Sequence, residues 1–83
     1  MRDQGERARM RALDLCLQLL EDALAEGKVR VDGPLGFRLR RLLGAAGLIP
    51  DHRLEGRRID RVLDDIFALQ ARVLGQDEEQ AAG

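Results

Sequence analysis

Few side chains in this sequence could carry out chemistry. Its 83 residues include one cysteine, Cys16, one histidine, His52, and no serine, threonine, asparagine or tyrosine. Without these types the chain has no hydroxyl nucleophile, no N-glycosylation motif and no site for Ser, Thr or Tyr phosphorylation. Hydroxyl-based nucleophilic catalysis and a tyrosine acid are therefore excluded.

Neither isolated residue has the neighbours that catalysis requires. Cys16 lies between Leu13 and Leu20 at helical spacing, and a thiol in apolar surroundings packs as a small hydrophobic group with a raised pKa. We therefore interpret Cys16 as a core residue. His52 falls in a predicted loop with no second His or Cys at the spacing of a zinc site, so we interpret it as a solvated loop residue.

The carboxylates occur in adjacent pairs, which are Glu21-Asp22, Asp64-Asp65 and Glu78-Glu79. Neighbouring helical residues point about 100° apart, so the helical pairs do not converge on one substrate atom. Asp60 and Asp64 share a helix face, but Arg57 and Arg61 lie among them, which is typical of a solvated ionic face. We expect a non-enzymatic protein with no catalytic residue, metal, cofactor or small-molecule substrate.

The sequence predicts an all-α fold. Leucine, alanine, arginine and acidic residues dominate, whereas there are only four valines and three isoleucines, which favours helix over sheet. Apolar residues recur at helical spacing over about 4–26, 34–46 and 56–74. We predict a small three-helix domain with a long first helix, a short middle helix and a long third helix.

Glycines mark the expected helix ends. Gly27, Gly47 and Gly75 each follow an apolar helical pattern, and Leu48 is expected to contact Leu43 in a Schellman motif. The start of the third helix is open between Asp51 and Gly56. The predicted domain covers residues 1–75, and residues 76–83 are predicted to form a flexible acidic tail.

The first helix has a wider apolar face than its own chain needs. Its main stripe consists of Met10, Leu13, Leu17, Leu20 and Leu24. Ala8, Ala12, Leu15 and Leu19 lie beside this stripe and widen the apolar arc to roughly 220°, where a surface helix needs little more than about 100°. We predict that a second copy covers these four residues in a helical-bundle homodimer, antiparallel or crossed. The alternative is a monomer with a few exposed leucines.

Charge is distributed unevenly along the chain. Residues 1–27 carry a net charge of −2, residues 28–61 of +5 and residues 62–83 of −4, for a total of −1. No acidic residue occurs between Asp32 and Asp51. The candidate partner-binding residues are seven arginines in the basic segment: Arg38, Arg40, Arg41, Arg53, Arg57, Arg58 and Arg61.

Three interpretations of this arginine cluster remain open. It could be a solvated face balanced by nearby acids, a docking surface for an acidic protein, or a nucleic-acid site with the second and third helices as a helix-turn-helix-like element. A single lysine, a net negative charge and the lack of Asn, Ser, Thr and Tyr argue against nucleic acid. We expect a non-catalytic regulatory or adaptor module that binds an acidic partner through residues 38–61, with DNA or RNA as the alternative.

The expected location is cytoplasmic, without a membrane partner. The first six residues lack the apolar core of a signal peptide, and no apolar run approaches the roughly 18 residues of a membrane helix. A single cysteine also precludes an internal disulfide, which suits a reducing compartment.

Overall fold

The computed structural model describes the backbone of residues 2–48 and 53–82 and the side chains of residues 5–48 and 53–75. The chain forms three α-helices, α1 (Arg2–Ala25), α2 (Gly33–Ala45) and α3 (Ile59–Ala82). No strand occurs among the described residues. The predicted all-α, three-helix fold is therefore confirmed. None of the described helices is both long and apolar enough to cross a bilayer.

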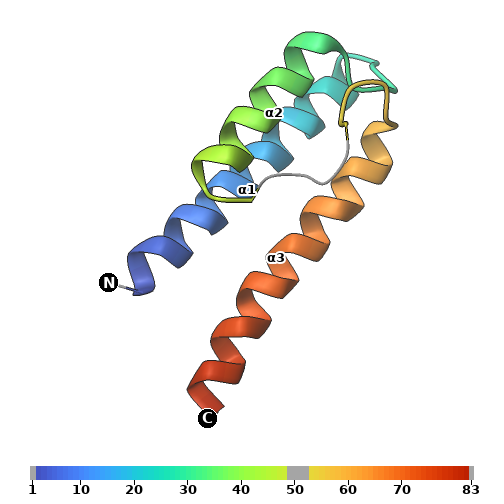
Figure 1. Ribbon diagram of the computed structural model, residues 1–83. Helices are drawn as coiled ribbons and strands as arrows, with labels where there is room; N and C mark the ends of the chain where they lie inside the picture. The colour runs from blue at the N-terminus through green and yellow to red at the C-terminus, as the bar shows by residue number, and fades with distance from the viewer. Residues whose placement is uncertain (1, 49–52, 83) are drawn as a thin grey trace.

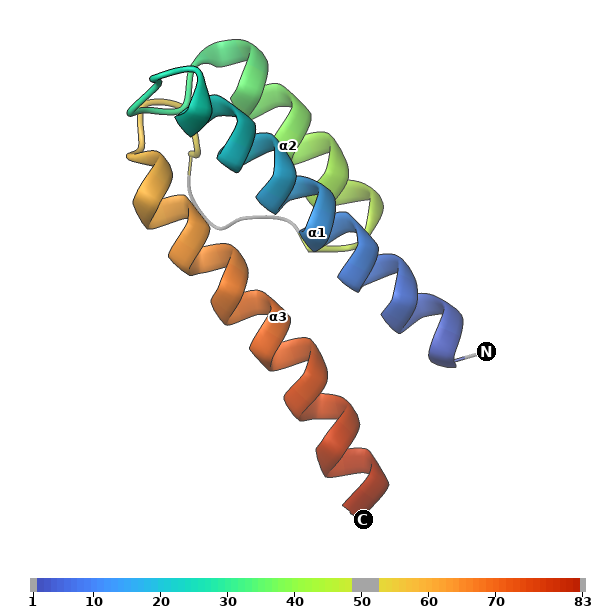
Figure 2. The same ribbon diagram turned by 180° about the vertical axis from the view of Figure 1, so that it is seen from behind.

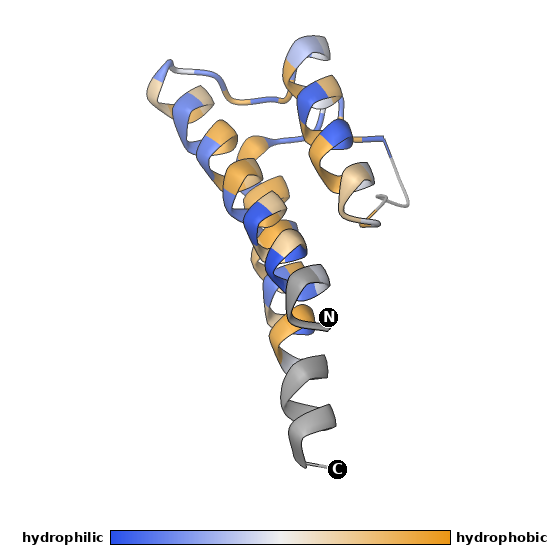
Figure 3. Cartoon of the chain, turned by 90° about the vertical axis from the view of Figure 1, so that its left-hand side faces the viewer, coloured by the Kyte–Doolittle hydropathy of each residue, from blue (hydrophilic) through white to orange (hydrophobic). Residues whose placement is uncertain are grey.

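α1 is the central helix of the domain. Both α2 and α3 pack against it rather than against each other within the described part of the chain. Seen from the side, α1 and α3 form one layer and α2 lies on one side of that layer (Figure 3). The chain ends lie at the same end of the molecule, which measures 44 × 21 × 19 Å (Figure 1).

The core is built from one stripe on each helix and from two residues of the connecting segments, Val31 and Leu54. On α2, Leu35, Leu39 and Leu43 are buried at intervals of four residues, as expected of a helix with one apolar face. The fully buried large side chains are Leu13, Leu20, Leu39, Leu43, Ile59, Val62 and Ile66. Leu24, which the sequence assigns to the buried stripe of α1, is instead exposed.

Two glycines end the first two helices as predicted. Gly27 and Gly47 have φ values of 89° and 73°, a region that only glycine enters without strain. The Lys28 N–H donates to the Ala23 carbonyl at 3.0 Å. The Leu48 N–H likewise donates to the Leu43 carbonyl at 2.7 Å, so both helices end in a Schellman motif.

The third helix begins later than either predicted start, at Ile59 rather than at Asp51 or Gly56. The segment before it pairs with the α1–α2 connection instead. The Val31 N–H donates to the Arg57 carbonyl and the Ile59 N–H donates to the Val29 carbonyl, each at 2.8 Å. This isolated antiparallel bridge between Arg30 and Arg58 engages the backbone of residues 57–59 and so delays the helix.

The predicted helix end at Gly75 is wrong, because α3 continues to Ala82. Gly75 does not have a positive φ. A glycine inside a helix costs only about 1 kcal/mol relative to alanine, and the following Gln, Glu and Ala residues are good helix formers. Residues 76–82, predicted as a tail outside the helix, therefore belong to α3.

Candidate docking surface

The exposed face of α2 carries an aromatic ring among arginines. Because Leu35, Leu39 and Leu43 point into the core, Phe37 and Arg41 lie on the outer side of the helix. Phe37 is 64% exposed, and the Arg41 guanidinium lies 5.9 Å from the centre of its ring, within the range of a cation–π contact. This contact holds a cationic and an apolar group side by side on the surface.

Two further arginines lie beside Phe37. Arg40 and Arg53 line an open cavity of about 230 Å³ together with Phe37, Leu54 and Glu55. Arg53 precedes the turn before α3, so the cavity joins α2 to a segment that is distant in sequence. We call Phe37, Arg40, Arg41 and Arg53 the Phe37 surface. It combines three predicted partner-binding arginines with an aromatic ring that was not among the predicted site residues.

The other four predicted arginines do not join this surface. Arg57 forms an ion pair with Asp65 at 2.6 Å and Arg58 forms one with Asp60 at 2.9 Å. Both pairs compensate, within the chain, the basic charge near the start of α3. Arg61 is exposed on α3, and Arg38 lies on the side of α2 that faces α1. The predicted cluster of seven arginines is therefore divided into separate groups.

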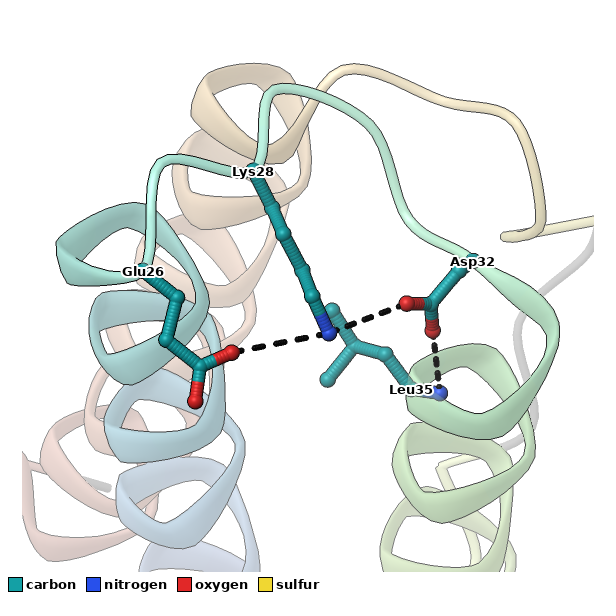
Figure 4. A network of polar contacts seen from close by, with 4 residues as sticks. All are labelled: Glu26, Lys28, Asp32 and Leu35. Atoms are coloured by element: carbon teal, nitrogen blue, oxygen red, sulfur yellow. Dashed lines mark hydrogen bonds and ion pairs between the residues drawn. The ribbon is translucent and has the colours of Figure 1, made fainter.

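Arg38 borders a second open cavity, of about 290 Å³, whose charges are largely paired within the chain. The Lys28 ammonium lies 3.0 Å from the Asp32 carboxylate and 3.6 Å from that of Glu26 (Figure 4). Asp32 also accepts a 2.8 Å hydrogen bond from the Leu35 N–H and so caps α2. These contacts form a network of ion pairs and a hydrogen bond that links the residue after α1 to the first turn of α2.

The same contacts shift the pKa values of the two charged groups in this network, Asp32 and Lys28. The hydrogen bond from the Leu35 N–H, followed by the contact with Lys28, lowers the pKa of the Asp32 carboxyl. The hydrogen bond and the charge of Asp32 raise the pKa of the Lys28 ammonium. Both groups are therefore held in their charged forms around neutral pH.

Cys16 is a core residue, as predicted. Its side chain is fully buried and burial raises the pKa of its thiol to about 11, so the thiol is protonated and unreactive at neutral pH. His52 lies outside the described residues. In the part of the chain that is described, no three His, Cys, Asp or Glu side chains gather where they could hold a metal ion.

The residues predicted for self-association do not form one exposed face. Ala12 is buried in the chain's own core, and Leu19 is half-buried against that core. Leu19 also lines a cavity with Leu35 of α2, so α2 covers part of the face that was assigned to a second copy. Leu15 and Ala8 remain exposed.

The predicted helix-turn-helix-like element is not formed. Such elements join two mutually packed helices by a turn of about three to four residues. Here α2 ends at Ala45, α3 begins at Ile59, and each helix packs on α1.

The comparisons with known proteins identify no relatives. No protein-family model, no curated protein and no solved structure matches the chain.

Proposed function

We propose that this protein is a non-catalytic regulatory or adaptor module that binds an acidic protein partner through the Phe37 surface. The observation that carries this proposal is the exposed Phe37 ring in contact with Arg41 and beside Arg40 and Arg53. Aromatic residues and arginine are enriched in protein interfaces, and burying such a ring on binding contributes much of the affinity.

The chemistry of this surface favours a segment in which an apolar side chain is flanked by carboxylates. The apolar group would cover the Phe37 ring, and the carboxylates would accept paired hydrogen bonds from the guanidinium groups. The sequence supports a positively charged surface here, because no acidic residue occurs between Asp32 and Asp51. Among the described residues that line the cavity, Glu55 is the one acidic side chain.

Nucleic acid is the alternative partner. Three arginines on one surface could contact phosphates, but a single aromatic ring offers little for stacking and the chain carries a net charge of −1. The dependence of binding on salt distinguishes the two classes, because nucleic-acid binding that depends on phosphate contacts weakens steeply as salt is added.

A paired set of probes tests the proposal. Fluorescence anisotropy is measured with a labelled Asp/Glu-rich peptide that contains leucine, and with a labelled random-sequence DNA duplex. We expect the peptide to bind, R40E/R41E to abolish its binding, and R9E/R72E, an equal charge change at two exposed arginines elsewhere, to retain most of it. Steeply salt-dependent binding of the duplex, without binding of the peptide, would support nucleic acid as the partner instead. Equal peptide binding by R40E/R41E and R9E/R72E would overturn the proposal that the peptide binds at the Phe37 surface.

We also propose that the module acts as a homodimer in the cytoplasm. Several large apolar side chains are exposed on α1 and α3, among them Leu15, Leu24 and Phe67. Sedimentation velocity of the full chain at several concentrations tests the dimer, and a concentration-independent monomer would exclude it.

A further inference from the structure

The α1–α3 layer has one face that α2 does not cover. α2 lies in front of α1 in Figure 1 and behind it in Figure 2, so Figure 2 looks onto the uncovered face of the layer. In both views the two helices run along each other in opposite directions. This face is separate from the Phe37 surface, which lies on the outer side of α2.

Apolar side chains line this uncovered face. On α1, Met10, Leu17 and Leu24 repeat every seven residues and lie about 140–180° around the helix from Leu19, which borders α2. On α3, Leu63, Phe67 and Leu74 lie within about 40° of one another around the helix, beside the arc of the buried core residues. We call these six residues the α1–α3 seam. Leu24, Phe67 and Leu74 are 42%, 52% and 50% exposed, and the other three are half-buried.

One polar contact joins the two sides of the seam. The Gln70 side-chain amide donates a 2.8 Å hydrogen bond to the Asp14 carboxylate. Met10 and Leu17 lie one turn before and after Asp14, and Phe67 and Leu74 lie one turn before and after Gln70. The bond therefore places the apolar residues of α1 next to those of α3 and makes one continuous strip.

The face is large enough for a stable interface. Two helices, each about 10 Å wide and sharing about 30 Å of length, present on the order of 600 Å². Two such faces in contact bury about 1,200 Å², the lower end of the range for specific protein interfaces. A second copy of the chain is thus sufficient to cover the seam.

The distribution of charge along α1 indicates which partner, and in which direction, packs on the α1–α3 seam. The first half of the described helix carries Arg7, Arg9 and Arg11 with one acid, Glu6, whereas the charged residues of the second half are all acidic: Asp14, Glu21 and Asp22. Arg7, Arg9, Arg11, Glu21 and Asp22 form no ion pair among the described residues. Arg7 and Glu21 are fourteen residues apart, about 21 Å along the helix, so they cannot meet within one chain. A copy turned end for end would bring them together.

We infer that a second copy of this chain packs antiparallel on the α1–α3 seam. In this register the two-fold axis lies at the level of Asp14, the apolar residues of the seam pack on both sides of it, and Arg7 of each protomer faces the partner's Glu21 at the rim. This inference rests on the proposed homodimer but moves its contact from the Ala8–Leu19 side of α1 to the opposite side. The Phe37 surfaces of both protomers stay free in this arrangement.

A matched pair of substitutions on α1 tests the choice of face. Leu24 and Leu15 are 42% and 41% exposed and lie on opposite sides of the helix. L24E introduces a charge into the seam, whereas L15E introduces it on the other side. In sedimentation velocity of the full chain, we expect at least a tenfold rise in the dimer dissociation constant for L24E and less than a threefold change for L15E. Circular dichroism verifies that both variants remain helical.

A charge exchange tests the direction of packing. R7E and E21R are each expected to weaken the dimer, and R7E/E21R to restore it, because the double variant recreates both rim pairs with reversed sign. In a parallel arrangement the two-fold axis would run along the helices and place α1 of one protomer on α3 of its partner, so Arg7 and Glu21 would not meet and the double variant would not restore the dimer through this pair. F67E offers an independent probe of the seam on α3 and is expected to act like L24E.

The possible outcomes distinguish a failure of the proposed interface from a failure of the proposed homodimer. A wild-type chain that stays monomeric overturns self-association altogether. A wild-type dimer that L15E weakens and L24E leaves intact retains self-association but overturns the seam. A dimer that L24E weakens but R7E/E21R fails to restore overturns the antiparallel direction alone.

Discussion

The Arg57 guanidinium lies 2.6 Å from the Asp65 carboxylate. This pair links the segment before α3 to the second turn of that helix, and the Arg57 carbonyl of the same segment accepts a hydrogen bond from the Val31 N–H. Basic residues near a helix N-terminus are unfavourable, and pairing with an acid of the same helix offsets that cost at Arg57. The location of these arginines, which marked them as candidates for partner binding, thus has a structural explanation within the chain.

Asp65→Asn is expected to lower the free energy of unfolding by about 0.5–1 kcal/mol, because both side chains are partly exposed and solvent screens the pair. Urea denaturation measures the change. Asp64→Asn is the control, since Asp64 is an exposed neighbour without an ion pair among the described residues. The difference between the two variants should shrink at high salt. Equal stability of the two variants would show that the pair adds nothing.

Leu20→Ala is expected to destabilise the fold by about 2–5 kcal/mol, since it removes a fully buried side chain from the face of α1 between α2 and α3. Leu15→Ala removes the same atoms at an exposed position and should cost much less. Chemical denaturation compares the two. A small loss for Leu20→Ala would mean that the core can collapse around the missing atoms.

The Asp32 cap should make stability depend on pH in the acid range. Because the pKa of Asp32 is lowered in the folded state, first by the Leu35 hydrogen bond, its contribution is present above the unfolded pKa and is lost as the pH falls through the folded value. Asp32→Ala should lower the melting temperature at neutral pH, and the gap to wild type should close on acidification. Asp32→Asn retains a capping group but removes the charge, so an intermediate melting temperature is expected. An Asp32→Ala gap that does not change with pH would contradict this assignment.

Two nearby glycines should respond to alanine with opposite sign. Gly47 has a φ of 73°, so Gly47→Ala forces a side chain into a left-handed conformation and should cost about 1–2 kcal/mol. Gly44 is helical and nothing lies within 4 Å of its missing Cβ, so Gly44→Ala should stabilise by about 0.5–1 kcal/mol. Thermal unfolding of both variants provides the comparison. Destabilisation by Gly44→Ala would indicate that this face of α2 is covered in solution.

Features with a local cause could be predicted from the sequence. The helical spacing of apolar residues identified three helices, and glycine after an apolar pattern identified two of their ends, at Gly27 and Gly47. The burial of Cys16 likewise followed from its neighbours one turn away in each direction. Each of these depends only on residues within a few positions of one another.

Features that depend on distant residues could not be predicted in this way. α3 begins at Ile59 because the backbone before it pairs with the α1–α2 connection, a contact between segments more than 25 residues apart. Helical spacing shows which residues of α1 are apolar but not which side each neighbouring helix occupies. Ala12 was predicted to face a second copy and is buried within the single chain, whereas Leu24 was predicted to be buried and is exposed. The position of Phe37 on the polar side of α2, one turn before Arg41, was the available signal for the Phe37 surface.

Both chain ends emerge at one pole of the elongated molecule, whereas Phe37 lies in the first half of α2, towards the opposite pole (Figure 1). A fusion, fluorophore or immobilising tag at either terminus would therefore project away from this ring.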